Sequence, residues 1–424
     1  MTRPAYATAS DDGLLMLRLL YAAFAFFVLL RVGLNSLILN QFMDYTTLEG
    51  STIQKIHPAF YGIVLIMATV LASYRIELNA VDLSLLRAIA TFLVGIVLLT
   101  TMLVVGGRNA AFGYILDSYI VACMAIFIMT TLPRPWRPLI AELLLAFLML
   151  SALVGTAEFA LKTRLLPYPG GEEVFRPTGL SDHPLELGQW CAVGICLASA
   201  TRWRMPFKIA AVAVLLIGVL ASGARFATLF AGLSCLVFLI TVRMAAPTPL
   251  DGLQRKIMLA LAGLLAVMAL IAVMFAAGAL SRFDSGVVDQ SALARVNIYG
   301  VFDYLTWNEF LFGGDITRIQ RIALDVFGLP FIESSVVIFT VQFGLVGAIL
   351  FAVLLANLFR ALLTGAPWNV IAGTVIFFTL SLSNNALSTK SADILMMTLL
   401  IMGCKAATPR RPIAWSLRRA PVRE

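Results

Sequence analysis

Apolar residues along the chain come in long runs that short polar segments separate. A helix of about 20 apolar residues crosses a hydrocarbon core of about 30 Å, and several of the runs reach that length. They lack the two-residue alternation of barrel strands, and lipid offers no partner to an open backbone, so the runs predict transmembrane helices. The pattern predicts twelve spans, at residues 14–39, 58–73, 86–105, 112–132, 138–160, 185–201, 207–222, 226–242, 257–280, 334–359, 367–384 and 391–404.

Composition points to the same class of protein. Of the 424 residues, 60% are hydrophobic and 13% are charged, and the mean hydropathy is +0.93. Soluble globular domains are about 25% charged, so these values exclude a soluble enzyme. We expect an all-α, polytopic integral membrane protein with a single transmembrane domain over residues 1–405. Residues 406–424 form a Pro- and Arg-rich basic tail, which we expect to be cytoplasmic.

Charged residues predict the orientation in the membrane. Lysine and arginine favour cytoplasmic loops, and alternate connections between the predicted spans carry at least one of them, which places both termini in the cytoplasm. Two long connections, residues 161–184 and 281–333, then face the outer side. The second is the largest loop and lies between the ninth and tenth spans. The net charge of +8 is therefore expected to anchor the inner face to membrane lipids, and no nucleic-acid partner is predicted.

Residues that commonly hold cofactors are few or scattered. The two histidines, His57 and His183, are too few for a histidine-rich metal centre, and the five cysteines form no Cys-x-x-Cys pair. The chain also has no Asp-x-Asp, Walker lysine, Gly-x-Gly-x-x-Gly or His-Glu-x-x-His motif. We therefore expect no metal and no cofactor.

Four ionisable residues lie at the entry to the sixth span, namely Arg176, Asp182, His183 and Glu186. Charged groups at membrane depth are costly, so each one that the sequence keeps is a candidate site residue. An ordinary helix start explains part of the same pattern, because Asp182 can cap a helix that begins at Pro184. The sequence leaves both interpretations open for Asp182 and His183.

A further arginine, Arg225, is a candidate for binding an anion. Arg225 follows Ser222 in a short break between two spans, and Arg295 lies in the large outer loop. Guanidinium is permanently charged, and its planar fork of donors suits phosphate oxygens. A snorkelling interfacial side chain is the alternative for Arg225. In the same loop, the apolar and aromatic stretch 299–312 predicts a surface helix, which a Gly-Gly turn follows.

Three more polar residues lie at the expected outer ends of late spans. Glu333 opens the tenth span, where a carboxylate can accept a proton or simply be favoured by the helix dipole. Asn384 and Asn385 end the eleventh span, where they can bind sugar hydroxyls or join helices as polar glue. Arg31 and Asp117 are embedded in apolar stretches; they can pair across helices and are not placed in the site.

The order of these motifs resembles the O-antigen ligase and polymerase superfamily. The resemblance covers most of residues 112–400, and within the superfamily the chain is most similar to VpsF-like exopolysaccharide biosynthesis proteins. The motifs that carry it are Arg176 to Pro184, Ser222 with Arg225, Arg295 with Gly313 and Gly314, and Glu333 and Ser334 followed by Gly344 and Gly347.

The resemblance implies a metal-independent glycosyltransferase of the bacterial inner membrane, with its active site facing the periplasm and an undecaprenyl-diphosphate-linked oligosaccharide as donor. Arg176, Arg225 and Arg295 match the arginines that bind the diphosphate. Ligases place a histidine-containing pair where this chain has Glu333, so Glu333 becomes the expected base, with His183 as its rival. The candidate sugar-binding residues are Asp182, Asn384 and Asn385.

Three functional hypotheses follow from this resemblance and from the pattern of charges. The first is a polysaccharide polymerase that joins lipid-linked repeat units in exopolysaccharide or O-antigen synthesis, with chain-length regulator and flippase proteins as candidate partners. The second is a ligase-type glycan transferase. The third is a flippase or transporter of lipid-linked saccharides. Many transporters have polar groups at the midplane of the membrane, in broken helices related by repeat symmetry. The gathering of polar residues at one face, beside the large loop, favours an enzyme.

Overall fold

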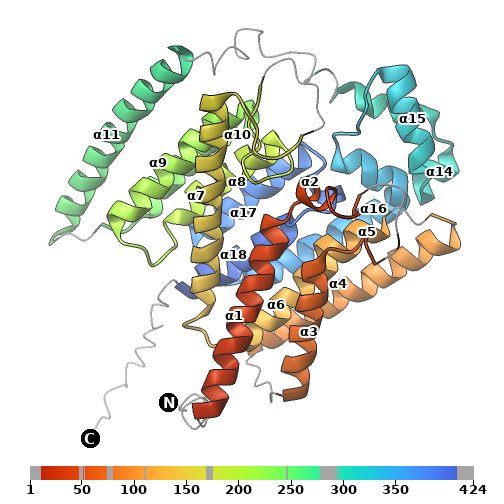
Figure 1. Cartoon of the computed structure of the whole chain (residues 1–424), viewed down its shortest axis with the longest axis horizontal. Coiled ribbons are helices and arrows are strands. Elements are labelled where there is room, and N and C mark those ends of the chain that lie inside the picture. The colour runs from red at the N-terminus through yellow and green to blue at the C-terminus, as the bar shows by residue number, and fades with distance from the viewer. Residues whose placement is uncertain are drawn as a thin grey trace, which may run out of the picture.

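The computed structural model describes residues 11–46, 51, 53–73, 80–108, 111–168, 175–244, 247–276, 293 and 296–407. Within these ranges every regular element is a helix, so the all-α prediction is confirmed (Figure 1). Arg295, residues 277–292 of the predicted large loop and residues 408–424 of the tail lie outside the described residues.

Each predicted apolar run coincides with a helix, and the fourth run is formed by α5, the π-helix η2 and α6 in succession. These elements are α1 (Asp11–Gly33), α3 (Pro58–Ser73), α4 (Ala80–Val105), α5 (Phe112–Tyr114), η2 (Ile115–Ile120), α6 (Val121–Thr131), α7 (Arg137–Leu161), α8 (Pro184–Ala198), α9 (Met205–Ser222), α10 (Arg225–Thr241), α11 (Pro249–Ala276), α16 (Ser335–Leu363), α17 (Trp368–Leu382) and α18 (Asp393–Ala407). Shorter elements lie between them: α2 (Ser36–Leu39), η3 (Ile298–Tyr304), α14 (Trp307–Phe312), α15 (Ile316–Phe327) and η4 (Ala386–Ser388).

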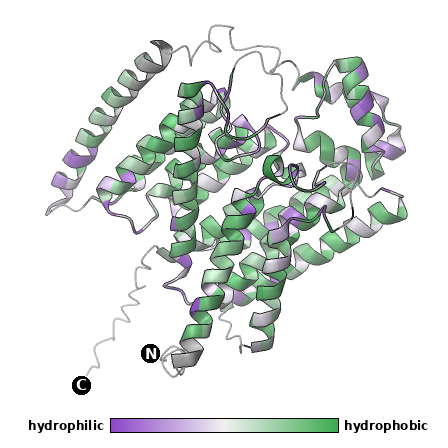
Figure 2. Cartoon of the chain, viewed as in Figure 1, coloured by the Kyte–Doolittle hydropathy of each residue, from purple (hydrophilic) through white to green (hydrophobic). Residues whose placement is uncertain are grey.

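The long helices carry the apolar surface that a membrane protein needs. In the described part of the chain, six helical segments are long and apolar enough to cross a membrane, and four shorter apolar helices accompany them. Figure 2 shows hydrophobic residues along most of the length of these helices. Leu65, Val94 and Leu229, among many others, are more than two-thirds exposed. Soluble monomers rarely expose large apolar patches, so the protein is membrane-embedded; the count of twelve spans stays a prediction.

The centre of the bundle is formed by α8 and α18. Residues Ile394 to Cys404 of α18 and Leu187 to Ala198 of α8 are all buried. A helix that is apolar all round belongs in the interior of a helical protein. Helices α7, α9, α10 and α17 pack around α8, while α6 and α7 pack against α18. The surrounding helices thus fix the first residues of α8 and α18 at one end of the bundle.

That end, which we call the loop end, collects the connections that follow α1, α4, α7, α9 and α17 and the one that precedes α16. Hydrogen bonds join these connections: Asn35 Nδ2 to Leu180 O (3.2 Å), Arg176 Nε to Ser222 O (3.2 Å), Arg108 Nη1 to Phe312 O (3.0 Å) and Ser335 N to Asn384 O (3.0 Å). The opposite end, which we call the basic end, has ion pairs between Arg137 and Asp82 (3.9 Å) and between Arg202 and Glu142 (3.0 Å). The predicted outer connections coincide with the loop end.

Residues 296–334 fold into a small helical unit at the start of α16. In this unit η3, α15 and the start of α16 enclose a second apolar core, which includes the fully buried Val301 and Ile319. The stretch predicted to be a surface helix forms η3 and α14, and the predicted turn follows at Gly313, whose φ is 95°. This unit places the segment around Glu333 beside the other connections of the loop end.

Candidate functional site

A cavity of about 500 Å³ lies at the loop end, and we call it the central pocket. Stretches that are far apart in the sequence surround it: the connection between α1 and α3, the start of α8, the segment before α16, and the connection between α17 and α18. Its charged and amide side chains are Asp182, His183, Glu186, Glu333, Asn384, Asn385, Lys390 and Asp393.

The central pocket brings together five of the eight residues that the sequence marks as site candidates. Asp182, His183, Glu333, Asn384 and Asn385 all line it. Two of the three predicted arginines lie elsewhere at the loop end, as described below, and the third is outside the described residues. The candidate base and the candidate sugar ligands therefore share one cavity, although they are spread over residues 182–385 of the sequence.

His183 is the N-cap of α8, because Pro184 occupies the first turn of the helix. Its Nδ1 accepts a hydrogen bond from Leu185 N at 3.1 Å. This bond uses the lone pair of the ring and leaves the proton of the neutral imidazole on Nε2. In this arrangement His183 is poorly suited to act as a base. The sequence offered Asp182 as the cap, but that role belongs to His183.

Asp182 joins the start of α8 to α2. Its Oδ1 accepts hydrogen bonds from Ser36 Oγ at 2.9 Å and from Leu37 N at 3.3 Å. Its backbone N donates to Glu186 Oε2 at 3.0 Å, which places two carboxyl groups next to each other. Burial raises the pKa of Asp182 above its usual range, although the bonds from Ser36 and Leu37 oppose this. The carboxyl of Asp182 therefore keeps its proton to a higher pH than that of an exposed aspartate.

Asp393 is a pocket residue that the sequence interpretation missed. It is the first residue of α18, is 1% exposed, and accepts a hydrogen bond on Oδ1 from Trp190 Nε1 at 2.5 Å. Within the described residues its Oδ2 has no hydrogen-bond partner. Leaving a buried carboxylate oxygen unbonded is costly, so Oδ2 is suited to accept a hydrogen bond from a ligand. An ionisable residue at the very start of the last apolar run was the signal for it.

Lys390 supplies positive charge to the same pocket, and it too was missed. Its Nζ donates to Tyr45 O at 2.8 Å and to Lys55 O at 2.9 Å, and it lies 4.6 Å from the centre of the Tyr45 ring. Burial lowers the pKa of Lys390 from its usual value. Arg31 donates to the main-chain oxygens of Lys390 and Ser391. Hydrogen bonds thus hold both the side chain and the backbone of Lys390 in place.

Arg31 and Asp117 do meet across helices, but not as the sequence suggested. The guanidinium of Arg31 donates to the main-chain oxygen of Asp117, at 3.1 Å from Nη2. Asp117 lies in the π-helix η2, which disturbs the regular pattern of backbone hydrogen bonds. Its carboxylate accepts instead from Tyr45 Oη at 2.8 Å and from the backbone N of His57. This buried network supports the floor of the central pocket.

Glu333 and Asn384 are placed by the start of α16. Ser334 is the N-cap of that helix, so Glu333 precedes the cap, and it is half-buried at the pocket. Ser335 donates from N and from Oγ to the main-chain oxygen of Asn384, which fixes the two segments side by side. The side chain of Asn384 donates to Gln189 Oε1 at 3.2 Å and therefore also joins helices, as one interpretation of the sequence had it.

Arg176 and Arg225 lie together on another side of α8. Arg176 is buried, and its Nε donates to the main-chain oxygen of Ser222, in the turn that leads to Arg225. Gly188 packs on this turn, because a Cβ there would lie 2.7 Å from Ser222 Oγ, whereas Glu186 faces the central pocket. The start of α8 thus has the two arginines on one side and the pocket carboxylates on another.

A buried carboxylate holds the segment that carries Arg176. Glu158, on α7, is 3% exposed, and its Oε2 accepts hydrogen bonds from Thr178 N at 2.9 Å and Gly179 N at 2.8 Å. Its Oε1 accepts from Leu165 N at 2.7 Å. A carboxylate that accepts three backbone N–H groups fixes the path of the chain strongly. Glu158 therefore ties Leu165, just after α7, to Thr178 and Gly179, just before α8.

The central pocket combines carboxylates, amides, hydroxyls and one lysine. Sugar hydroxyls both donate and accept hydrogen bonds, so this mixture suits a saccharide better than it suits a bare anion. Among the described residues no group of His, Cys, Asp and Glu is arranged to hold a metal ion. Comparisons of the chain with protein-family models, with curated proteins and with solved structures find no match.

Proposed function

We propose that the protein is a polysaccharide polymerase: a glycosyltransferase that joins undecaprenyl-diphosphate-linked oligosaccharide units at the periplasmic face of the bacterial inner membrane. The observation that supports it best is the convergence of Asp182, His183, Glu333, Asn384 and Asn385 on one cavity. Asp182, His183 and Glu333 belong to two of the motifs that resemble the O-antigen ligase and polymerase superfamily, and Asn384 and Asn385 end the eleventh predicted span. These segments are far apart in the sequence, and their meeting in one cavity supports the proposal.

In the proposed reaction, an acceptor hydroxyl attacks the anomeric carbon of the donor sugar. The bond between that carbon and the diphosphate oxygen breaks, and the undecaprenyl diphosphate leaves with its electron pair. Glu333 takes the proton of the attacking hydroxyl, a role that a carboxylate can fill at hydrogen-bond range. Its half-buried position at the pocket suits this role, and the Nδ1 bond of His183 disfavours the histidine.

The arginines would stabilise the leaving group. Negative charge develops on the diphosphate as the sugar bond breaks, and preorganised guanidinium groups stabilise such charge without a metal ion. Arg176 and Arg225 both lie at the turn that contains Ser222, so the two are assigned together to the diphosphate. The third predicted arginine, Arg295, is assigned to the diphosphate from its motif alone.

The first experiment is the lipid-linked saccharide profile of a deletion strain, with each species assigned to a leaflet by a glycosidase added from outside. Single repeat units that accumulate in the outer leaflet would support a polymerase. Accumulation in the inner leaflet alone would refute it and make the protein a flippase. Polymer that forms normally but stays unattached to its acceptor would identify a ligase.

Two variants then test the assigned residues in the complemented strain. We expect Arg225→Ala to abolish polymer and Glu333→Gln to lower it by about 10²-fold or more, since general base catalysis contributes 10²–10⁴-fold. Asp325→Asn, at an exposed carboxylate on α15, is the matched control and should make normal polymer. Membrane levels measured by immunoblot must be equal. Normal polymer from either variant would remove that residue from the mechanism.

A further inference from the structure

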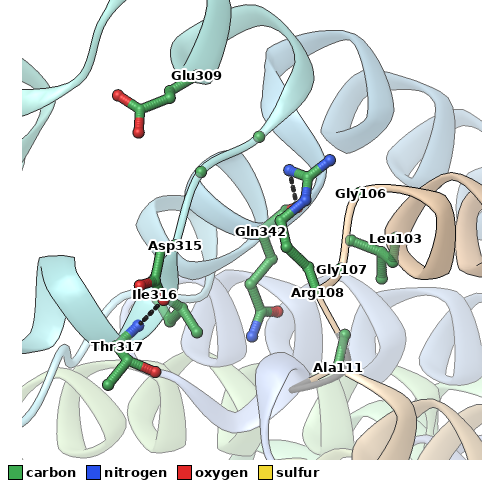
Figure 3. Close-up of a pocket in the computed structure, with 12 residues that line it drawn as sticks. Leu103, Gly106, Gly107, Arg108, Ala111, Glu309, Asp315, Ile316, Thr317 and Gln342 are labelled. Atoms are coloured by element: carbon green, nitrogen blue, oxygen red, sulfur yellow. Dashed lines mark hydrogen bonds between the residues drawn. The ribbon is translucent and has the colours of Figure 1, made fainter.

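A second cavity, of about 570 Å³, lies at the loop end, and we call it the side pocket. Three segments surround it: the connection between α4 and α5, the turn between α14 and α15, and the middle of α16 (Figure 3). Figure 3 shows Arg108, Gln342, Asp315 and Thr317 around its space, with Glu309 on the side of α14. None of these residues lines the central pocket or belongs to the motifs that the sequence marked.

Glycines allow the wall of the side pocket to form. Gly344 interrupts α16 with a φ of 73°, and Gly313 has a φ of 95°, conformations that favour glycine. A Cβ on Gly344 would collide with the main-chain oxygen of Leu311, and one on Gly313 would collide with Arg108 Nη1. The backbones of the turn and of α16 therefore touch directly. This contact makes the side pocket a built cavity, not a gap between loops.

Arg108 is clamped into that wall. Its Nη1 donates to the main-chain oxygens of Phe312 at 3.0 Å and of Gln342 at 3.3 Å. One nitrogen thus holds the side chain in place, and the other guanidinium nitrogens remain to serve a ligand. The planar group is fixed before any ligand arrives, so little side-chain entropy is lost when one binds.

Opposite the guanidinium, the side pocket presents hydrogen-bond acceptors. Asp315 uses Oδ1 to cap α15, accepting from Thr317 N at 2.8 Å, which leaves Oδ2 and the exposed Thr317 hydroxyl available. Gln342 uses Oε1 to accept from Tyr114 Oη at 2.7 Å, and its amide nitrogen is left as a donor. A phosphate would face the carboxylate of Asp315, because Glu309 is already paired with Arg318 at 2.7 Å, and a bare cation would face Arg108. A neutral, polyhydroxylated saccharide can bind both the guanidinium and the acceptors opposite it, because its hydroxyls both donate and accept hydrogen bonds.

The bond between Tyr114 and Gln342 connects the two cavities. Tyr114 lines the central pocket and Gln342 lines the side pocket, so this hydrogen-bonded pair forms part of the wall between them. An enzyme that joins two saccharides must hold both of them near one reacting centre. The geometry therefore offers one compartment for the saccharide that reacts and a neighbouring one for the glycan attached to it.

We propose that the side pocket is a second saccharide-binding site, which holds the glycan of the acceptor through Arg108, Asp315, Thr317 and Gln342. This inference rests on the proposed polymerase function, because only a reaction between two glycans needs the second site. Weaker binding of the acceptor glycan lets the growing polysaccharide dissociate after fewer additions. Side-pocket variants are therefore expected to shorten the polymer, whereas the catalytic variants abolish it.

Asp315→Asn and Thr317→Val test the proposal in the full-length protein. Asparagine caps a helix as well as aspartate does, and valine matches the shape of threonine, so the fold is retained. Asp325→Asn, an exposed change on the same helix, is the control. Two measurements are made for each protein: the chain-length distribution of polymer in the complemented deletion strain, and the affinity of purified protein in nanodiscs for the repeat-unit oligosaccharide, released from its lipid by mild acid.

We expect both variants to shift the polymer to short chains and to weaken oligosaccharide binding about tenfold, as loss of one net hydrogen bond of about 1.4 kcal/mol would do. Arg225→Ala should abolish polymer and leave this binding unchanged. Chain lengths and affinities equal to those of Asp325→Asn would overturn the side-pocket proposal while the polymerase function stands. If the deletion strain still makes polymer, the polymerase function fails, and the oligosaccharide affinities alone decide whether the side pocket binds saccharide.

Discussion

The two ends of the helix bundle treat buried carboxylates in opposite ways. At the basic end, Glu142 lies 3.0 Å from Arg202 and Asp82 lies 3.9 Å from Arg137, so each acid has a cation. At the loop end, Asp182, Glu186 and Asp393 line one pocket, and within the described part of the chain none of them forms an ion pair. Their hydrogen-bond partners are backbone amides, a serine hydroxyl and an indole.

This difference separates a structural end from a functional one. An acid that is already paired with a cation stabilises the fold. It offers a ligand little additional interaction energy. Buried acids that are close together and form no ion pair are unfavourable in the empty protein, and perturbed groups of this kind cluster at functional sites. The basic end is therefore expected to tolerate loss of a carboxylate charge, and the loop end is not. The following predictions test this contrast, from the largest expected effect to the smallest.

The largest effect is expected from Asp393→Asn compared with Asp82→Asn. Asparagine at 393 still offers Oδ1 to the Trp190 indole, so we expect the protein to stay folded. It removes the charge from the oxygen that lacks a partner, and a hydrogen bond to a charged group is worth about 1.5–3 kcal/mol, which corresponds to roughly a 10–100-fold loss of polymer. The measurement is polymer yield at equal folded protein, determined by size-exclusion chromatography. Equal yields from both variants would contradict the expectation that only the loop end is sensitive to loss of a carboxylate charge.

The second comparison concerns stability and uses Glu158→Gln with Glu142→Gln. Glu158 accepts three backbone N–H groups, and a glutamine would turn its own NH₂ toward some of these donors. We expect a loss of about 1–3 kcal/mol for Glu158→Gln. The pair that Glu142 forms involves a side chain of Arg202 that is 41% exposed, so its loss should cost about 0–1 kcal/mol. Thermal unfolding in detergent measures both, and a larger effect at Glu142 would contradict the assignment of Glu158 as a positioning residue.

Hydropathy predicted the helices because burial in lipid depends on composition, which the sequence shows directly. The candidate site was only partly predictable. Asp182, His183 and Glu333 stood out because they interrupt or border apolar runs. Asp393 borders an apolar run as well, but its place in the same pocket depends on α18 being central and on its bond to Trp190, a contact across 203 positions. No local pattern encodes such a contact.

Backbone irregularities explain the remaining differences. The sequence suggested pairing between Arg31 and Asp117, but a π-helix turned the contact into one with a main-chain oxygen. The side pocket escaped notice for the same reason. It depends on the break of α16 at Gly344 and on the clamp around Arg108, whereas the sequence marked Gly344 and Gly347 only as part of a family motif. A hydrophobic pattern carries no information on where a helix will break.

The smallest effect concerns the pH dependence of stability at Asp182. Because burial raises its pKa, the folded protein keeps this proton at pH values where an unfolded aspartate, with a pKa of about 3.9, has lost it. The resulting stabilisation is fully present below the unfolded pKa and is lost as the pH rises through the folded pKa. Asp182→Asn, which cannot ionise, escapes this loss and can still accept from Ser36 and Leu37.

The melting temperature of Asp182→Asn, relative to that of the wild type, should therefore rise between pH 4 and pH 7. Asp325→Asn changes an exposed carboxylate and should give a nearly constant difference over the same range. A constant difference for Asp182→Asn as well would mean that Asp182 is ionised throughout in the folded protein. The loop end would then hold its acids as charged groups, as the basic end does, and the pocket would need a cationic partner to balance them.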